Sequence, residues 1–168
     1  WFDSSRRIWS IMQSIKLYNM REVDELIILD ISSTLTWSEI NYTEFKDFCI
    51  ECNIPITMWW WIQNIEQVKR LIYNWADKIS LNSILYTNPN IIREIATIFW
   101  SQAIVASIDV KKNDWNYICY SHSWTKEVNI DLFDHIKNIE KLWAWEILIT
   151  SIEKDWTMSW YDLDLIEK

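Results

Sequence analysis

The chain has 168 residues, half of them hydrophobic, which suffices for one buried core and predicts one domain. Its 16 Lys and Arg against 24 Asp and Glu give a net charge of −8, which argues against a nucleic-acid or anionic-membrane partner. Three cysteines, no signal-peptide layout and no apolar stretch near the roughly 18 residues of a membrane span lead us to expect a soluble, cytoplasmic protein.

Strand-like and helical segments alternate along the chain. Five apolar runs have the length of buried strands, at residues 25–31, 54–58, 78–82, 103–110 and 146–152. Segments of helical period occupy residues 10–19, 41–52, 65–74, 88–99 and 129–142, the fourth with Pro89 near its start. Strands that are apolar on both faces and separated by single helices predict right-handed βαβ units and a parallel sheet.

Two features favour a closed barrel over an open sheet. Polar residues follow the strands at Asp30, Asn82, Asp109 and Thr150, the end at which barrel active sites are built. The stretches "VDELIILDIS" and "AWEILITSIE" also resemble each other, as in a duplicated half-barrel. A complete barrel needs about 250 residues. We therefore predict an α/β fold, an incomplete (β/α)8 TIM barrel, with residues 1–168 forming a single partial domain.

The composition contains one anomaly, which is 14 tryptophans and no glycine. Average usage predicts about 12 glycines in a chain of this length. Tryptophan also occupies glycine-type positions: Trp75, Trp100 and Trp143 follow helical segments, and "NDWNY" and "SHSWTK" read as turns. Stacking on nucleic acid would need a basic groove, and core filling would place indoles inside the elements. We hypothesise that tryptophan stands for glycine, through a UGA codon read as tryptophan or through deliberate replacement.

With glycine in place of tryptophan, the sequence resembles the cyclase subunit of imidazole glycerol phosphate synthase. The matching stretches cover nearly the whole chain: "VDELIILDIS", "ITMWWWIQN", "WADKISLNS", "NPNIIREIATIFWSQAIVASIDVKK" and "KLWAWEILITSIEKDWTMSWYDLDLI". The resemblance implies a (β/α)8 barrel running from about the first helix through the sixth strand. The first strand and strands seven and eight would be absent.

The resemblance implies an enzyme that takes ammonia from a glutaminase partner subunit, in a heterodimer. The enzyme closes an imidazole ring and cleaves a phosphorylated aminoimidazole nucleotide into imidazole glycerol phosphate and an aminoimidazole carboxamide ribotide. General acid–base catalysis needs carboxylates facing each other across the barrel mouth. Asp109 in "ASIDVKK" matches one catalytic aspartate, and the other would lie upstream of Trp1. A carboxylate capping a strand-to-loop turn is the alternative for Asp109.

The resemblance also implies a phosphate site. Converging backbone N–H groups in a glycine-rich turn bind anions, and Trp59, Trp60 and Trp61 occupy the family's triple glycine. Asn82 and Ser83 match residues near the same phosphate. Further positions match the substrate cleft, namely Asp30, Thr150, Ser151 and Asp155, although these polar groups could simply satisfy strand ends and turns. Three indoles would block the phosphate, so we expect the printed sequence to be inactive and unstable.

At the opposite end of the barrel, Glu25, Lys78 and Glu146 match charged residues through which the family admits ammonia. On the sequence alone, each is an ordinary strand-start charge. The resemblance implies no cofactor and no metal, and "CIEC" (Cys49 and Cys52) is interpreted as part of a helix rather than a zinc or redox motif.

Two alternatives to the histidine pathway remain open. The N-terminal stretch "FDSSRRIWSIMQSIKLYNMREVDELI" resembles a paralogous branch encoded with surface-glycan genes, in which the same barrel supplies ammonia for the amidination of a sugar. A barrel fragment that binds phosphate without catalysis is the second alternative. His122 and His135 match no family role.

Overall fold

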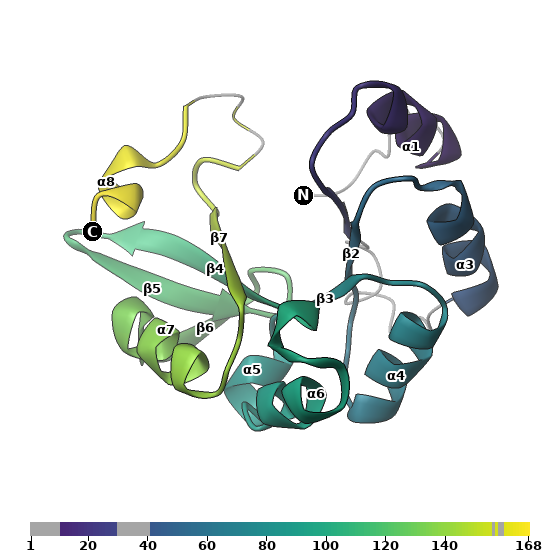
Figure 1. The fold of residues 1–168 in the computed structure, drawn as a ribbon. Helices are drawn as coiled ribbons and strands as arrows, with labels where there is room; N and C mark the ends of the chain where they lie inside the picture. Colours follow the sequence, from purple (N-terminus) through teal and green to yellow (C-terminus); the bar gives the residue numbers. More distant parts are fainter. Residues whose placement is uncertain (1–10, 30–40, 156, 158–159) are drawn as a thin grey trace.

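The computed structural model describes residues 11–29, 41–155, 157 and 160–168, and its centre is a curved parallel sheet. Parallel strands pair in the spatial order β1 (Leu26–Leu29), β2 (Ile56–Trp59), β3 (Lys78–Leu81), β4 (Ile104–Asn113) and β7 (Glu146–Ser151). These strands form an open arc with helices along its outer side (Figure 1). The arc confirms the predicted α/β fold and partial (β/α)8 barrel.

The outer helices are α1 (Ile11–Met20), α3 (Tyr42–Glu51), α4 (Ile65–Tyr73), α6 (Ile91–Phe99) and α7 (Leu132–Lys141). Shorter turns are α5 (Ile84–Thr87), η1 (Ser101–Ala103) and α8 (Leu163–Ile166). Helix α4 begins where predicted, because the side chain of Asn64 accepts a hydrogen bond from the backbone N–H of Gln67 at 3.0 Å. Its apolar face then buries Val68 and Leu71.

The core lies between the sheet and the helices. Ile79 on β3 and Ile104 and Ile108 on β4 are fully buried against Ile91 and Ile95 of α6. These β-branched side chains fit a strand that is covered on both faces, which is why strands β3 and β4 read as continuous apolar runs.

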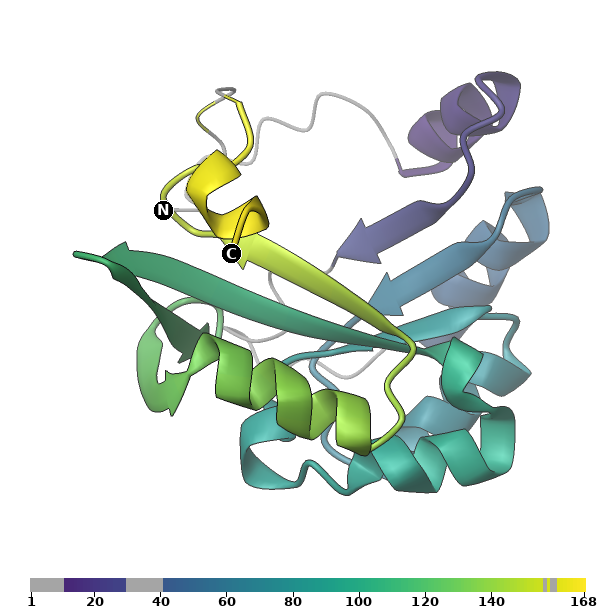
Figure 2. The ribbon, with the colours of Figure 1, turned by 60° about the vertical axis from the view of Figure 1, so that its left-hand side comes forward.

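A β-hairpin corrects one part of the predicted fold. Strand β4 continues past the predicted residue 110 and pairs antiparallel with β5 (Asn116–Ser121), which pairs with β6 (Lys126–Asp131) (Figure 2). The helix predicted over residues 129–142 therefore starts only at Leu132. Asp131 ends β6 and caps α7, because its carboxylate accepts hydrogen bonds from the N–H groups of Phe133 and Asp134.

Backbone angles support the glycine interpretation of the tryptophans. Trp75, Trp100 and Trp143 directly follow α4, α6 and α7 or their caps, with φ of 80°, 75° and 77°, and Trp124 has φ of 70°. Trp100 combines its φ with ψ of 154°, a region that essentially only glycine populates. Trp100 is 79% exposed, so packing does not explain the residue at this position.

Candidate functional site

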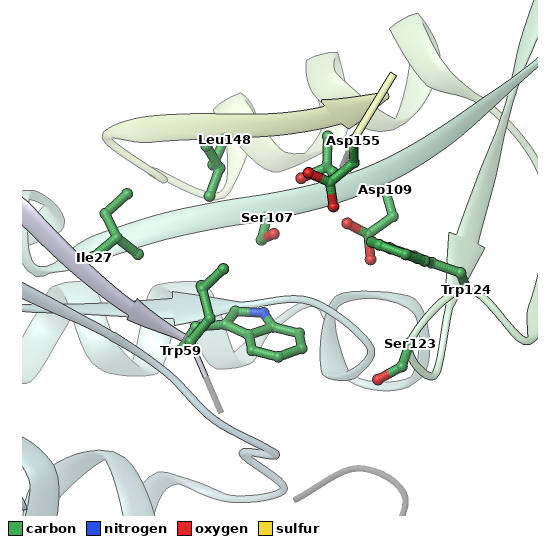
Figure 3. A pocket seen from close by; sticks show the side chains of 10 residues that line it. Ile27, Trp59, Ser107, Asp109, Ser123, Trp124, Leu148 and Asp155 are labelled. Carbon is green, nitrogen blue, oxygen red and sulfur yellow. The ribbon is translucent and has the colours of Figure 1, made fainter. Parts of the chain in front are cut away.

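A pocket of about 260 Å3 lies at the carboxyl ends of the strands, the end at which the site was predicted. Side chains from β1, β2, β4 and β7 and from the β5–β6 turn surround it (Figure 3). The apolar residues Ile27, Leu29 and Leu148 line one part. The polar lining residues are Ser107, Asp109, Ser123, Thr150 and Asp155, together with the indoles of Trp59 and Trp124.

Asp109 is the most buried carboxylate of this pocket, with 5% of its surface exposed. Burial raises its pKa to about 6, although hydrogen bonds from Trp124, Thr150 and Asn82 oppose the shift. The charge of Asp155 raises the pKa of Asp109 further. A carboxyl group with this pKa can both donate and accept a proton near neutral pH, as a general acid–base group must.

Asn82 connects the catalytic candidate to the β3 end. Its amide Nδ2 donates to Asp109 Oδ2 at 3.0 Å and to the Ser107 carbonyl oxygen at 3.1 Å. The hydroxyl of Ser83 donates to Asn82 Oδ1 at 3.2 Å and accepts the backbone N–H of His122 at 3.0 Å. A continuous hydrogen-bonded chain therefore runs from the β5–β6 turn through Ser83 and Asn82 to Asp109.

The three tryptophans at the end of β2, residues 59–61, have different surroundings. Trp59 lines the pocket, and Trp60 packs partly buried against the core. The indole N–H of Trp60 is buried and has no hydrogen-bond partner in the described part of the chain. The ring of Trp61 meets the ring of His122 edge-on, with centroids 5.1 Å apart. The side chains thus occupy the surroundings of the turn whose backbone was predicted to bind phosphate.

The structure separates the predicted cleft residues. Thr150 and Asp155 line the pocket with Asp109. Ser151 points elsewhere, because successive side chains of a strand face opposite sides, and its hydroxyl donates to Asp162 Oδ2 at 2.9 Å. Asp30 lies outside the described residues.

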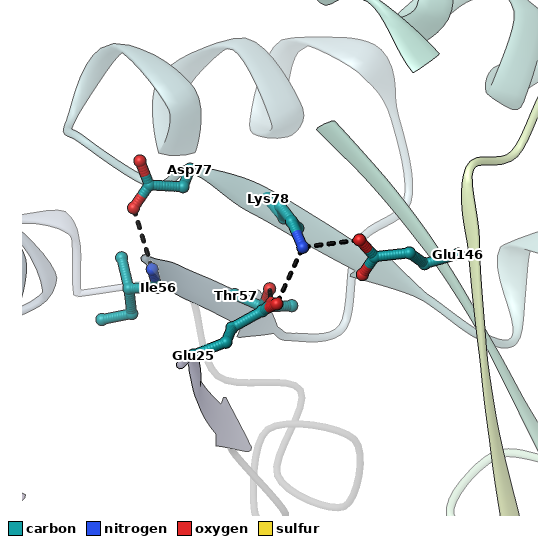
Figure 4. Close-up of polar contacts among 6 residues, drawn as sticks. All are labelled: Glu25, Ile56, Thr57, Asp77, Lys78 and Glu146. Carbon is teal, nitrogen blue, oxygen red and sulfur yellow. Dashed lines mark hydrogen bonds and ion pairs between the residues drawn. The ribbon is translucent and has the colours of Figure 1, made fainter. Parts of the chain in front are cut away.

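A three-residue ion cluster lies at the amino-terminal end of the strands, where the resemblance placed a charged entrance (Figure 4). Lys78 Nζ lies 2.7 Å from Glu25 Oε2 and 2.6 Å from Glu146 Oε1, so one ammonium bridges residues at the starts of β1, β3 and β7. The hydroxyl of Thr57 donates to Glu25 as well. Partial burial raises the pKa of Glu25, but the hydrogen bonds from Lys78 and Thr57 outweigh it and hold the pKa below its usual value.

Four residues near Asp109 were not predicted from the sequence. Ser107 precedes Asp109 by two residues on β4 and faces the same side, a relation that the strand period could have revealed. Ser123 and Trp124 line the pocket and His122 lies beside it, all from the β5–β6 turn. The sequence indicated a turn at "SHSW", but it did not indicate that the turn folds back over the strand ends.

The described ranges carry no feature of a metal centre or of a membrane span. There, no three His, Cys, Asp or Glu side chains gather closely enough to hold a metal ion. Likewise, none of the helices in those ranges is long and apolar enough to cross a bilayer. Cys49 lies in α3 and Cys52 caps it, as interpreted from the sequence.

The described elements define a class of protein, a (β/α)8 barrel seen in part, with its pocket at the carboxyl ends of the strands. The family model described as "Histidine biosynthesis protein" matches residues 2–168. The chain therefore belongs to the histidine biosynthesis protein family, as the motifs predicted.

Individual relatives agree with this assignment. The chain is 34% identical over 166 residues to imidazole glycerol phosphate synthase subunit HisF of Chlorobaculum tepidum, covering 99% of this chain and 66% of the relative. It is 38% identical over 151 residues to the subunit HisF of Sulfurisphaera tokodaii, covering 90% and 61%. A putative subunit HisF of Leptospira interrogans is 32% identical over 169 residues, covering 99% and 66%. The chain thus spans less than two thirds of the length of these relatives.

Proposed function

We propose that the protein containing this chain is the cyclase subunit of imidazole glycerol phosphate synthase. It would use ammonia from a glutaminase partner to form imidazole glycerol phosphate and the aminoimidazole carboxamide ribotide. The proposal includes glycine at the positions printed as tryptophan, and it treats residues 1–168 as one partial barrel domain. Family membership and the names of the relatives support the reaction.

The single observation that carries the proposal is the environment of Asp109. Its carboxyl is buried at the end of β4, has a pKa raised to about 6, and is held by the Asn82 amide. Ring closure and cleavage of the substrate both require proton transfers, and a carboxyl group poised near the working pH serves them best. Thr150 and Asp155 in the same pocket would contact the substrate.

The two ends of the barrel would have different tasks. At the carboxyl end, the turn at residues 59–61, with glycine in place of the indoles, would bind a phosphate of the substrate, aided by Ser83. At the amino end, the cluster of Glu25, Lys78 and Glu146 would control the entry of ammonia into the barrel.

The test uses the complete natural protein in a strain that lacks the cyclase. We expect complementation by the wild type and its loss with Asp109→Asn, with ammonia-dependent turnover of the purified enzyme falling about 100-fold or more. Asp114→Asn is the matched control, since Asp114 lies in the exposed β4–β5 turn with φ of 52°, which asparagine tolerates.

Two results would contradict the proposal. Full activity of Asp109→Asn would remove Asp109 from the mechanism. A folded wild type that fails to complement, while the gene lies among sugar-modifying genes, would instead favour the paralogue that supplies ammonia for the amidination of a sugar.

A further inference from the structure

The turn between β5 and β6 forms one wall of the pocket and includes the buried hydroxyl group of Ser123. Ser123 and Trp124 line the cavity opposite Trp59 (Figure 3). The Ser123 hydroxyl is buried and has no hydrogen-bond partner within the described chain. A buried polar group without a partner is costly, so this hydroxyl fits a position that a polar ligand satisfies.

His122, the preceding residue, contacts both parts of the proposed phosphate site. Its backbone N–H donates to Ser83 Oγ at 3.0 Å, and its ring lies edge-on to Trp61 with centroids 5.1 Å apart. These partners follow β3 and β2, whereas His122 follows β5. Three segments far apart in the sequence therefore meet at His122, through its backbone N–H and its ring, although the family resemblance gives this residue no role.

The described lining of the pocket offers no cationic side chain to an anionic ligand. Of the described residues that line it, two are carboxylates, Asp109 and Asp155, and none is a lysine or an arginine. The Nδ1 atom of His122 forms a hydrogen bond with Ser121 Oγ at 2.9 Å. The other ring nitrogen, Nε2, is therefore the atom that can bind a ligand. Partial burial and the charge of Lys126 on β6 lower the pKa of His122, and a phosphate dianion beside the ring would act in the opposite direction.

We propose that His122 binds the substrate phosphate from the β5–β6 turn, with its imidazolium facing the anion held at Ser83 and residues 59–61. This inference rests on the phosphate site of the proposed function and adds a contact to it. With glycine at position 61, the space occupied by the indole beside the imidazole would be open to the phosphate. The Ser123 hydroxyl would supply a further donor.

The test is proton NMR of the 168-residue chain carrying Trp61→Gly in a background in which the positive-φ tryptophans, Trp75, Trp100, Trp124 and Trp143, are glycine as well, titrated with inorganic phosphate. The chain has two histidines, so two imidazole signals report separately. His135 is the internal reference, because it is 5% exposed and stacked on Tyr86 at 4.6 Å. We expect phosphate to raise the pKa of His122 by about 0.5–1 unit and to leave His135 unchanged.

Two further variants in the Trp61→Gly chain complete the design. His122→Gln should weaken phosphate binding about three- to tenfold, because it removes a charge-assisted hydrogen bond but keeps a polar side chain. Ser83→Ala reports on the phosphate site independently of His122. If His122→Gln does not fold, the pKa measurement in the parent chain decides alone. The triple variant of Trp59, Trp60 and Trp61 to glycine repeats the experiment with a fully opened turn.

The outcomes separate the two proposals. Phosphate binding that depends on Ser83 but leaves the pKa of His122 unmoved would overturn the role of His122 and keep the phosphate site. No phosphate binding in either glycine background would overturn the phosphate site and this inference with it.

Discussion

The backbone at Trp100 allows a direct test of the glycine interpretation. Trp100 lies at φ 75° and ψ 154° after α6, where any side chain with a Cβ costs about 1–3 kcal/mol. Trp100→Gly and Trp100→Ala both remove the indole, so they lose the same packing. The alanine variant keeps the backbone strain. The glycine variant has more conformational freedom in the unfolded state, which lowers its stability by roughly 0.5–1 kcal/mol. We therefore expect glycine to be more stable than alanine at this position, by up to about 2 kcal/mol.

The control is Trp115, which is 86% exposed and whose φ is not positive. There the order should reverse, with alanine more stable than glycine by about 0.5–1 kcal/mol. Free energies of unfolding come from urea titrations with linear extrapolation. The measurements use a chain in which the other positive-φ tryptophans, Trp75, Trp124 and Trp143, are already glycine, because the printed sequence is expected to be unstable. Alanine equal to or better than glycine at position 100 would refute the reasoning.

Three further predictions concern the site, the ion cluster and the natural protein. The pKa of Asp109 is raised to about 6 on folding, so its ionisation destabilises the fold as the pH rises from about 4 past 6. Asp109→Asn should therefore stabilise the chain by about 2–3 kcal/mol at pH 8 and hardly at pH 4, and urea titrations showing destabilisation at pH 8 would contradict this. The pKa of Glu25 is lowered, so the stability that its ionised carboxylate contributes is present above the unfolded value near 4.3 and is lost as the pH falls. Glu25→Gln should therefore lower the free energy of unfolding by about 1 kcal/mol at pH 7 and by little at pH 3, in the same urea titrations. Peptide mass spectrometry of the natural protein should find glycine at residues 59–61, and tryptophan there would end the recoding hypothesis.

The sequence predicted the parallel strands well for a physical reason. Strands β2, β3 and β4 are covered on both faces, so their apolar runs are continuous and stand out from the helical period around them. The hairpin escaped prediction because its strands alternate or are largely exposed, as β6 shows. In sequence, such strands resemble loops. The helix predicted after them therefore included residues 129–131, which belong to β6.

The sequence indicated several residues of the candidate site, but it did not indicate which of them contact each other. Asp109 and Thr150 were placed at strand ends and Asp155 was matched to the substrate cleft, and the three residues share a pocket. The hydrogen bond between Asn82 and Asp109 joins positions 27 residues apart, and no local pattern encodes which way an amide turns at the end of a strand. The fold of the β5–β6 turn over the pocket, which brings His122 to Ser83, depends on the hairpin and was therefore missed with it.

The open arc has a consequence for handling these 168 residues in solution. Within the described residues, β1 hydrogen-bonds only to β2, and β7 only to β4, so each strand leaves a row of backbone donors and acceptors facing outward. Unpaired edge strands can form hydrogen bonds with strands of neighbouring molecules. A dilute sample would stay monomeric, whereas concentrating it would build edge-to-edge assemblies that light scattering detects before precipitation.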